Sequence, residues 1–287
     1  MLARRISRAD HPVSRKLISQ AALKVLYGLR DAGFEAYLVG GAVRDILAGI
    51  EPKDFDIATN AHPEQMRRVF RTARLIGRRF VIVHVRFGDE IIEVTTFRGA
   101  ITDSHERDDT GRILSDNEYG TLESDALRRD FTVNALYYDI NDHAVIDFVG
   151  GVDDIQNRMV RLIGETELRY REDPVRMMRA VRIANKLRFS IDAASETAIA
   201  RLAPLLGEIP AARLFDEVIK ILLSVDAVAN FHGLRARGLF AELFPYTESS
   251  LQRHPGFERF IVRALENTAQ RIADDLPVTP AAAATRR

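Results

Sequence analysis

The sequence contains no cysteine and no run of eighteen consecutive apolar residues. The missing cysteines exclude disulfides, thiolate zinc sites, iron–sulfur clusters and cysteine nucleophiles. The missing apolar run excludes an ordinary membrane-spanning helix. The chain begins MLARR, without the apolar core of a secretory signal. We therefore expect a cytoplasmic protein.

An excess of charge of one sign is also missing, because 41 basic residues balance 41 acidic ones. Residues 1–30 are the exception, with seven basic residues against Asp10 alone, a local charge of +6. Such a basic arm points weakly to a nucleic-acid partner. Arginine makes up 36 of the basic residues, and its planar fork matches phosphate. A GC-rich genome gives the same bias without any function.

The length of 287 residues suggests two domains. Short strand-like and helical segments alternate up to about residue 150, and helical periodicity dominates after it. We predict an α+β protein: a head at 1–150 with a small mixed sheet and helices, followed by an all-α neck and partial body at 151–287.

Hydrophobic periodicity places the individual elements. In the head it predicts strands at 35–39 and 53–58, hairpins at 80–97 and 137–149, and helices at 43–47, 63–71 and 126–136. Further on it predicts helices near 152–158, 174–188, 194–206, 211–224 and 256–274. Residues 100–124 are charged and aperiodic, which is typical of a long functional or disordered loop.

Two acidic residues, Asp54 and Asp56, stand two positions apart in a predicted strand and therefore project from one face. Neighbouring carboxylates repel, so one pKa must rise unless a cation lies between them. Mg²⁺ suits such oxygen ligands. An isolated Asp-x-Asp is, however, common on exposed strands.

A glycine pair, Gly40-Gly41, precedes these acids and ends a predicted strand. Its backbone N–H groups can approach a phosphate closely, and Arg44 in the following helical turn can grip the same anion. A Gly-Gly after a strand is usually only a turn. The order strand, Gly-Gly, helix, strand, Asp-x-Asp within seventeen residues is a far less frequent coincidence.

Four segments together carry a family resemblance. LVGGAVRD at 38–45, with DFD at 54–56, resembles the head motif of class II nucleotidyltransferases, the bacterial poly(A) polymerases and tRNA CCA-adding enzymes of the polymerase β superfamily. RRDFTVNA at 128–135 resembles the second motif. DFVGGVDD at 147–154, running on to VRLI at 160–163, resembles the third, and EDPVRMMRA at 172–180 the fourth. The resemblance covers residues 14–275.

The resemblance implies roles for particular residues. Asp54, Asp56 and Glu93 would hold two Mg²⁺ ions, and Asp130 is sometimes counted with the catalytic acids. The residues implied in nucleotide binding, with ATP as substrate, are Gly40, Gly41, Arg44, Asp45, Arg98, Arg129, Asp130, Asn134, Asp173, Arg176 and Arg179. Asp173 and Arg176 would read the edge of the base, and Arg182 and Lys186 would bind RNA phosphates.

Each of these residues also has a purely structural interpretation. Glu93 can form a salt bridge, for example to Arg98, and Arg129-Asp130 can be a solvated pair. Asp173 precedes Pro174 and is suited to cap a helix. The basic row beyond it can be a solvated helix face. His84 suits a histidine of the core and is assigned no chemistry.

Within the family we favour the poly(A) polymerase branch over CCA addition, because LIGRRF at 75–80, HPVSRK at 11–16 and YR at 170–171 resemble that branch. The expected reaction adds AMP from ATP to RNA 3′ ends by a two-metal mechanism. Poly(A) polymerases of this type continue past residue 287, so the chain is expected to be truncated. An inactive RNA-binding remnant, a nucleotide sensor and a nucleotidyltransferase for small substrates remain as alternatives.

Overall fold

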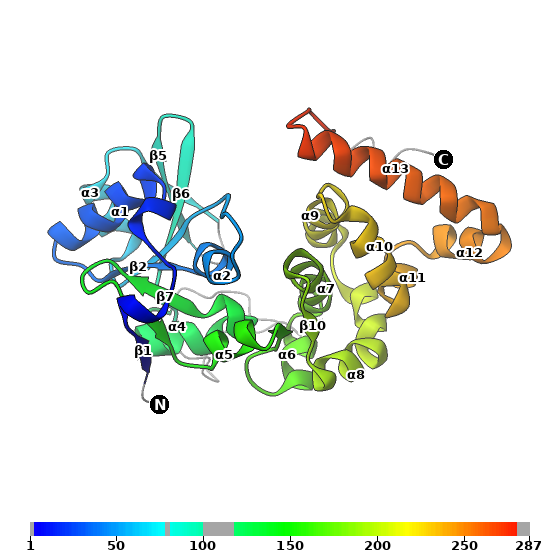
Figure 1. Ribbon diagram of the computed structural model, residues 1–287, viewed down its shortest axis with the longest axis horizontal. Coiled ribbons are helices and arrows are strands. Elements are labelled where there is room, and N and C mark those ends of the chain that lie inside the picture. The colour runs from blue at the N-terminus through cyan, green and yellow to red at the C-terminus, as the bar shows by residue number, and fades with distance from the viewer. Residues whose placement is uncertain (1–2, 78–80, 100–117, 280–287) are drawn as a thin grey trace. The chain divides into compact units, whose positions relative to one another are not determined.

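The computed structural model describes residues 3–77, 81–99 and 118–279. Its contacts divide the chain into two units (Figure 1). The first unit runs to residue 157 and also takes in 161–164, and the second comprises 158–160 and the residues from 165 onward. The division therefore falls slightly later than the residue 150 expected from the sequence. Most of the expected loop at 100–124 lies outside the described residues.

The first unit is built on a sheet of eight described strands. They are β1 (Arg4–Ile6), β2 (Ala36–Val39), β3 (Asp56–Thr59), β4 (Ala73–Ile76), β5 (Ile82–Phe87), β6 (Glu90–Thr96), β7 (Leu136–Asp139) and β8 (Val145–Asp147). Their order across the sheet is β1-β8-β7-β2-β3-β6-β5-β4. β3 and β6 pair in parallel, and the other neighbours are antiparallel.

Five α-helices accompany this sheet in the described part of the unit. They are α1 (Gln20–Asp31), α2 (Gly41–Leu47), α3 (Pro63–Val69), α4 (Leu122–Arg128) and α5 (Gly151–Gln156). A 3₁₀ turn, η3 (Thr132–Asn134), precedes β7, and two more, η1 (Arg8–Asp10) and η2 (Arg15–Leu17), precede α1. The sheet and its helices confirm the mixed α+β head.

Helix α1 lies in the basic arm, where charge was the only feature noted in the sequence. Ser19 caps it, because its Oγ accepts a hydrogen bond from Ala22 N at 3.1 Å. Val25, Leu26 and Leu29 are fully buried, and the helix packs against β2, β3 and β6. The arm is thus part of the fold and not a loose basic tail.

The register of the strands aligns one residue from each of the eight strands in a single row. We call this set the cross-strand row: Arg5, Ile146, Tyr137, Val39, Asp56, Glu93, His84 and Arg74. Residues paired across neighbouring strands project from the same face of a sheet. The row therefore passes from apolar side chains on β8, β7 and β2 to polar ones on β3, β6, β5 and β4.

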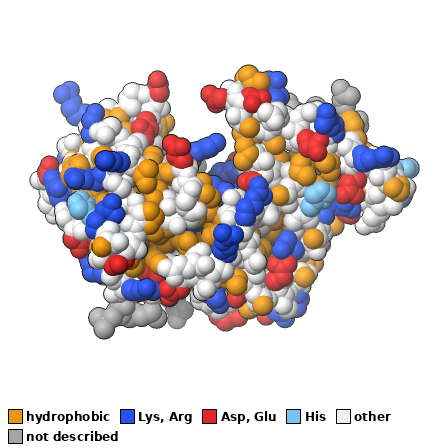
Figure 2. Space-filling view, viewed as in Figure 1, with side chains coloured by type: hydrophobic (Ala, Val, Ile, Leu, Met, Phe, Trp, Pro, Cys, Tyr) orange, Lys and Arg blue, Asp and Glu red, His pale blue; other side chains and the backbone are white. Residues whose placement is uncertain are grey.

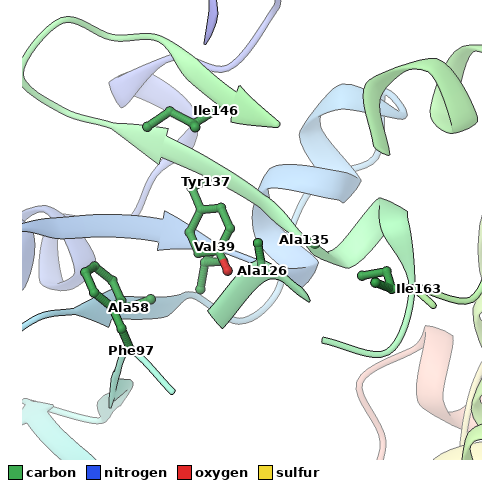
Figure 3. Close-up of a cluster of buried hydrophobic side chains, with 8 residues drawn as sticks. All are labelled: Val39, Ala58, Phe97, Ala126, Ala135, Tyr137, Ile146 and Ile163. Carbon is green, nitrogen blue, oxygen red and sulfur yellow. The ribbon is translucent and has the colours of Figure 1, made fainter. Parts of the chain in front are cut away.

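The apolar half of the row is buried in a hydrophobic cluster (Figure 3). Val39, Tyr137 and Ile146 meet Ala126 of α4 and Phe97 there. The polar half is more open, with the side chain of Glu93 49% exposed and that of His84 29% exposed. Asp56 therefore lies between the buried and the exposed side chains of the row.

The helix expected at 126–136 is wrong. Helix α4 begins after Thr121, whose Oγ1 accepts from Ser124 N at 3.2 Å, and ends at Arg128. Phe131 then forms a β-bridge with Leu162, and Thr132 N donates to the Arg161 carbonyl at 3.0 Å. These bonds to a distant segment replace the helical ones, so tertiary pairing overrides the local preference.

The third sequence motif braces the second one. Asp147 Oδ1 accepts from Val149 N, Gly150 N and Gly151 N at 2.9–3.0 Å, and Oδ2 accepts from Val152 N at 2.9 Å. The carboxylate thereby satisfies the free N–H groups at the start of α5. Asp154 on that helix accepts from Thr132 Oγ1 at 2.6 Å.

The second unit is helical apart from a small parallel pair, β9 (Met159–Val160) and β10 (Ser190–Ile191). Its described helices are α6 (Thr166–Glu172), α7 (Val175–Leu187), α8 (Ala193–Leu202), α9 (Ala211–Leu222), α10 (Ala227–Ala236), α11 (Leu239–Leu243), α12 (Pro245–Arg253) and α13 (Pro255–Ala273), with the 3₁₀ turn η4 (Ala203–Glu208). Met177, Ala180, Val181 and Ala184 of α7 are buried, as their helical spacing predicts.

The described helices and the visible surface both carry charged side chains. Among the described residues, no helix has the length and apolar character needed to span a membrane. Basic and acidic side chains are interspersed over the visible face in Figure 2, in keeping with the balanced net charge.

We expect Gly151→Ala to destabilise the first unit. A Cβ at this position would overlap the carbonyl oxygen of Thr132, and backbone cannot move aside cheaply. The free energy of unfolding should fall by about 2–3 kcal/mol, measured by denaturant titration. Gly207→Ala is the control, because nothing lies within 4 Å of its added Cβ. Equal stability of the two variants would contradict the brace.

Candidate nucleotidyl-transfer site

The site begins at a backbone hinge between β2 and α2. Gly40 has φ +71° and ψ −127°, a conformation that residues with a Cβ rarely adopt. Its ideal Cβ position lies 3.5 Å from Arg129 Nη1 and 3.9 Å from Asp56 Oδ2. The hinge therefore brings the backbone close to a cationic and an anionic side chain at once.

The three acids expected to bind metal lie near this hinge on neighbouring segments. Asp56 begins β3, and the parallel pairing sets it directly opposite Glu93 of β6. Asp54 lies two residues before the strand starts, so the strand begins later than the sequence suggested, at 56 instead of 53. Phe55 and Ile57 are buried on the other side, which leaves the acids on the open side.

The electrostatics of Asp56 are those of a carboxylate that lacks a counter-ion. Burial, helped by the negative charges of Glu93 and Asp54, raises its pKa to about 6, against the opposing effect of Arg129 and Arg44. A divalent cation between the acids would remove this penalty, and carboxylate oxygens are ligands that Mg²⁺ accepts. The donor set therefore fits the metal chemically.

The acids are not gathered as a finished metal site. No three His, Cys, Asp or Glu side chains in the described part of the chain are close enough together to hold an ion. Glu93 Oε1 instead lies 3.5 Å from His84 Nε2. Ion binding by Asp54, Asp56 and Glu93 requires side-chain rotation, which the 49% exposure of the Glu93 side chain permits. The salt bridge between Glu93 and Arg98 that the sequence suggested is not observed, because Glu93 lies against His84 and Arg98 pairs with Asp125.

Arg44 is tied into the interior of the first unit. Its Nε and Nη2 donate to Asp45 Oδ1 at 2.9 and 2.6 Å, and its Nη1 donates to Asn134 Oδ1 at 2.6 Å. Asn134 Nδ2 in turn donates to Asp130 Oδ1 at 3.0 Å. The network links the first motif to the second. Arg44, Asp45 and Asn134 are all buried, so direct binding of nucleotide by Arg44 stays a prediction.

Asp125, which sequence reasoning missed, holds two of the predicted nucleotide-binding arginines. Its Oδ1 accepts from Arg98 Nε at 3.1 Å, and its Oδ2 accepts from Arg129 Nη2 and Tyr137 Oη at 2.9 and 2.7 Å. Burial raises the pKa of Asp125, but the charges of Arg129 and Arg98 outweigh it and leave the pKa below its usual value. The only signal in the sequence was the spacing of four residues to Arg129, typical of a helical ion pair.

In the second unit, Asp173 and Arg176 each have a protein partner. Asp173 Oδ1 accepts from Val175 N at 3.3 Å, the contact of a helix cap, and Oδ2 pairs with Arg213 Nη2 at 2.6 Å. Arg176 Nη1 donates to the Arg169 carbonyl at 2.7 Å and to Glu172 Oε2 at 3.2 Å. The Asp173 side chain thus bonds the first turn of α7 although the cap position itself falls at Pro174, and reading of a base edge stays a prediction.

The predicted basic row on α7 is partly neutralised. Arg182 Nε donates to Glu217 Oε1 of α9 at 2.6 Å, and that carboxylate is buried. Arg179 and Lys186 are half-buried on the same helix. RNA binding by Arg182 and Lys186 stays a prediction.

The basic arm is also partly neutralised. Arg4 pairs with Asp153 at 2.7 Å, and Arg5 pairs with Asp139 and Asp142. These ion pairs weaken the argument that the arm itself is a nucleic-acid site.

We expect the half-buried charge of Asp56 to make stability depend on pH when no divalent cation is present. The unfolded carboxyl ionises near pH 4 and the folded one near 6. The unfolding free energy of the wild type should therefore fall relative to that of Asp56→Asn as pH rises from 4 to 6, by up to about 3 kcal/mol. Chemical denaturation across this range measures the difference. Asp89→Asn, an exposed control, should show no such trend, and a wild type that tracks Asp56→Asn at every pH would refute the expectation.

Two family models match the chain. "Poly A polymerase head domain" matches residues 36–161, and "Probable RNA and SrmB- binding site of polymerase A" matches residues 188–251. Among curated proteins, Poly(A) polymerase I of Salmonella typhi is 50% identical over 96% of this chain and 61% of its own length. That of Haemophilus influenzae is 47% identical over 96% and 63%. The chain thus spans about three-fifths of these relatives.

CCA-adding enzymes are also similar. That of Lactobacillus helveticus is 40% identical over 70% of this chain and 49% of its own length. The Bacillus stearothermophilus CCA-adding enzyme in complex with CTP has a TM-score of 0.67 at 38% identity, over 78% of this chain and 53% of that one. A CCA-adding enzyme in apo form II has a TM-score of 0.69 over 99% and 73%, at 22% identity, and shows the fold alone. Together with the motifs and the site geometry, these matches show that the chain belongs to the class II nucleotidyltransferase family of bacterial poly(A) polymerases and tRNA CCA-adding enzymes.

Proposed function

We propose that this chain transfers AMP from ATP to RNA 3′ ends without a nucleic-acid template, as a poly(A) polymerase does. The observation that carries the proposal is the pairing of Asp56 with Glu93 next to the Gly40 hinge, with the pKa of Asp56 raised to about 6. Such a site holds anionic side chains ready for a cation and offers backbone N–H groups to a phosphate. The identity to Poly(A) polymerase I supports adenylation.

The acids act as the metal-binding group of the proposed reaction. Asp54, Asp56 and Glu93 would hold two Mg²⁺ ions, and this group would supply Lewis acidity for the attacking hydroxyl and positive charge for the triphosphate. The backbones of Asp56 and Glu93 are held rigidly, since each lies in a strand paired on both sides, and the 49% exposed side chain of Glu93 is free to adjust. Catalysis then rests on positioning and electrostatics, without a covalent enzyme intermediate.

The nucleotide phosphates are held, in this proposal, at the hinge. The backbone N–H of Gly41, at the start of α2, is offered to the anion, and Arg129 Nη1 lies beside Gly40, whose own N–H donates to the Leu136 carbonyl at 3.4 Å. Asp125 fixes the orientation of Arg129 through two hydrogen bonds to its guanidinium. Arg44, through Asn134, keeps Asp130 in place. These residues preorganise the site before the substrate binds.

The second unit contributes base recognition and RNA binding in this proposal. Asp173 with Arg213, and Arg176 with Glu172, form two carboxylate–guanidinium pairs with hydrogen-bonding edges. Such edges can replace the edge of a templating base. A cytoplasmic location remains a prediction.

Asp54→Asn should abolish AMP incorporation, because it removes a metal-binding charge. The melting temperature should stay within about 1–2 °C, since Asp54 is exposed and makes no ion pair with a described residue. Incubation with ATP, Mg²⁺ and a 5′-labelled RNA, resolved on a denaturing gel, measures the product ladder.

Glu51→Gln is the matched control for that experiment, an exposed acid three residues earlier in the same segment. It should extend the RNA at the wild-type rate. Full activity of Asp54→Asn would overturn the proposed role of the acids, and an inactive wild type would favour an RNA-binding remnant.

The alternative function is CCA addition, which the similarity to CCA-adding enzymes keeps open. We expect a long run of AMP on a generic primer and no preference for a tRNA that lacks its terminus. Incorporation assays with each of the four nucleoside triphosphates on both RNAs distinguish poly(A) synthesis from CCA addition. Incorporation of two CMP and one AMP on the tRNA alone would establish the alternative.

A further inference from the structure

The cross-strand row continues past the acids to two residues that the proposed chemistry does not use. His84 of β5 is register-paired with Glu93, and Arg74 of β4 is register-paired with His84. All four residues from Asp56 to Arg74 therefore project from one face of the sheet. Neighbouring strands are about 4.8 Å apart, so Arg74 stands roughly 10 Å beyond Glu93.

The far end of the row carries positive charge that the described protein does not neutralise. Arg74 is exposed and forms no ion pair with any described residue. Arg68 and Arg71, just before β4, share both properties, whereas Arg67 is paired with Glu64 at 3.3 Å. Three guanidinium groups that form no ion pair with any residue of 3–77, 81–99 or 118–279 thus lie on or near the edge strand of the sheet.

The same face also offers apolar surface. Ile76, two residues after Arg74, is 46% exposed, and Ile91, two residues before Glu93, is 50% exposed. Side chains two apart on a strand share a face, so both isoleucines flank the row. A surface that combines cations with apolar side chains fits a nucleic-acid strand, whose phosphates and bases alternate between these two kinds of contact.

The order of the row indicates which substrate lies there. Along the sheet, the hinge that follows Val39 comes first, the acids come next, and His84 and Arg74 come last. In phosphoryl transfer the attacking and leaving oxygens lie roughly in line, on opposite sides of the phosphorus. If the triphosphate is held at the hinge, the strand that attacks must approach from the other side of the acids, where Arg74 lies.

We propose that Arg74 and His84 bind the backbone of the RNA primer just upstream of its 3′-hydroxyl, with Ile76 and Ile91 beside the terminal bases. The inference rests on the proposed function and names the place of its second substrate. Arg74 forms a charge-assisted contact with a phosphate. His84 lies between that phosphate and Glu93, and its contact with Glu93 holds the carboxylate in position.

The test compares Arg74→Gln and the double variant Arg74→Gln/His84→Gln with the wild type. KM for a short oligoadenylate primer should rise roughly tenfold in the single variant, the effect of one lost charge-assisted contact. It should rise further in the double variant, while KM for ATP in the single variant stays within about twofold. The melting temperature should not change in the single variant, because Arg74 is exposed on an edge strand.

Arg263→Gln is the charge-matched control. Arg263 lies on α13, is 75% exposed and pairs with Glu266. It should leave both KM values unchanged. An unchanged KM for the primer in the double variant would overturn the proposal. A rise in KM for ATP in Arg74→Gln equal to its rise in KM for the primer would also overturn it, because Arg74 would then bind the triphosphate.

Primer binding without ATP separates this proposal from the proposed function. Fluorescence anisotropy with a labelled oligoadenylate should show weaker binding by Arg74→Gln, with a log–log salt slope smaller by about 0.7. If the wild type incorporates no nucleotide, the proposed function fails, but the anisotropy measurement still tests whether Arg74 binds the primer. Wild-type affinity and slope in Arg74→Gln would then overturn the primer site by itself.

Discussion

The arrangement of the site depends on strand register. Val39, Asp56 and Glu93 are aligned because β2 pairs with β3 and β3 pairs with β6 in one specific alignment. A shift of one residue would turn Asp56 into the interior and Ile57 toward the open side. The burial of Ile57 and Val94 on the other face opposes that shift. The hydrophobic side of the sheet therefore determines where the acids lie.

Two carboxylates in the first unit, one buried and one half-buried, show opposite electrostatic outcomes. Asp125 has two arginines against it, and their charges keep its pKa below the usual value despite burial. Asp56 has two acids nearby, and burial with their charge raises its pKa to about 6. The first carboxylate is satisfied by the fold itself and the second is not. An unsatisfied charge of this kind is typical of functional sites.

Periodic segments were predictable from the sequence, and contacts between distant segments were not. The alternation in β2, β5 and β6 and the apolar stripe of α7 are local patterns, and the structure confirms them. The apolar stripe of α1 is equally local, but residues 1–30 were interpreted by their charge alone and the helix was not predicted. The end of α4 depends on bonds from Phe131 and Thr132 to residues 161–162, which no local pattern contains. The predicted hairpin at 80–97 can set His84 opposite Glu93. Arg74 and Asp56 could not be placed in this row beforehand, because no strand was predicted at β4 and because β3 pairs with β6 across intervening segments.

The side-chain partners in the site were the least predictable part. The motifs identified Arg98, Arg129 and Arg44 but not that Asp125 and Asn134 hold them. One consequence of the shared carboxylate at Asp125 is thermodynamic. Because a single buried anion neutralises two guanidinium groups from separate segments, the effects of replacing Arg98 and Arg129 cannot add independently. Loss of one arginine leaves the other as the sole counter-charge of Asp125, so the second replacement costs more free energy than the first.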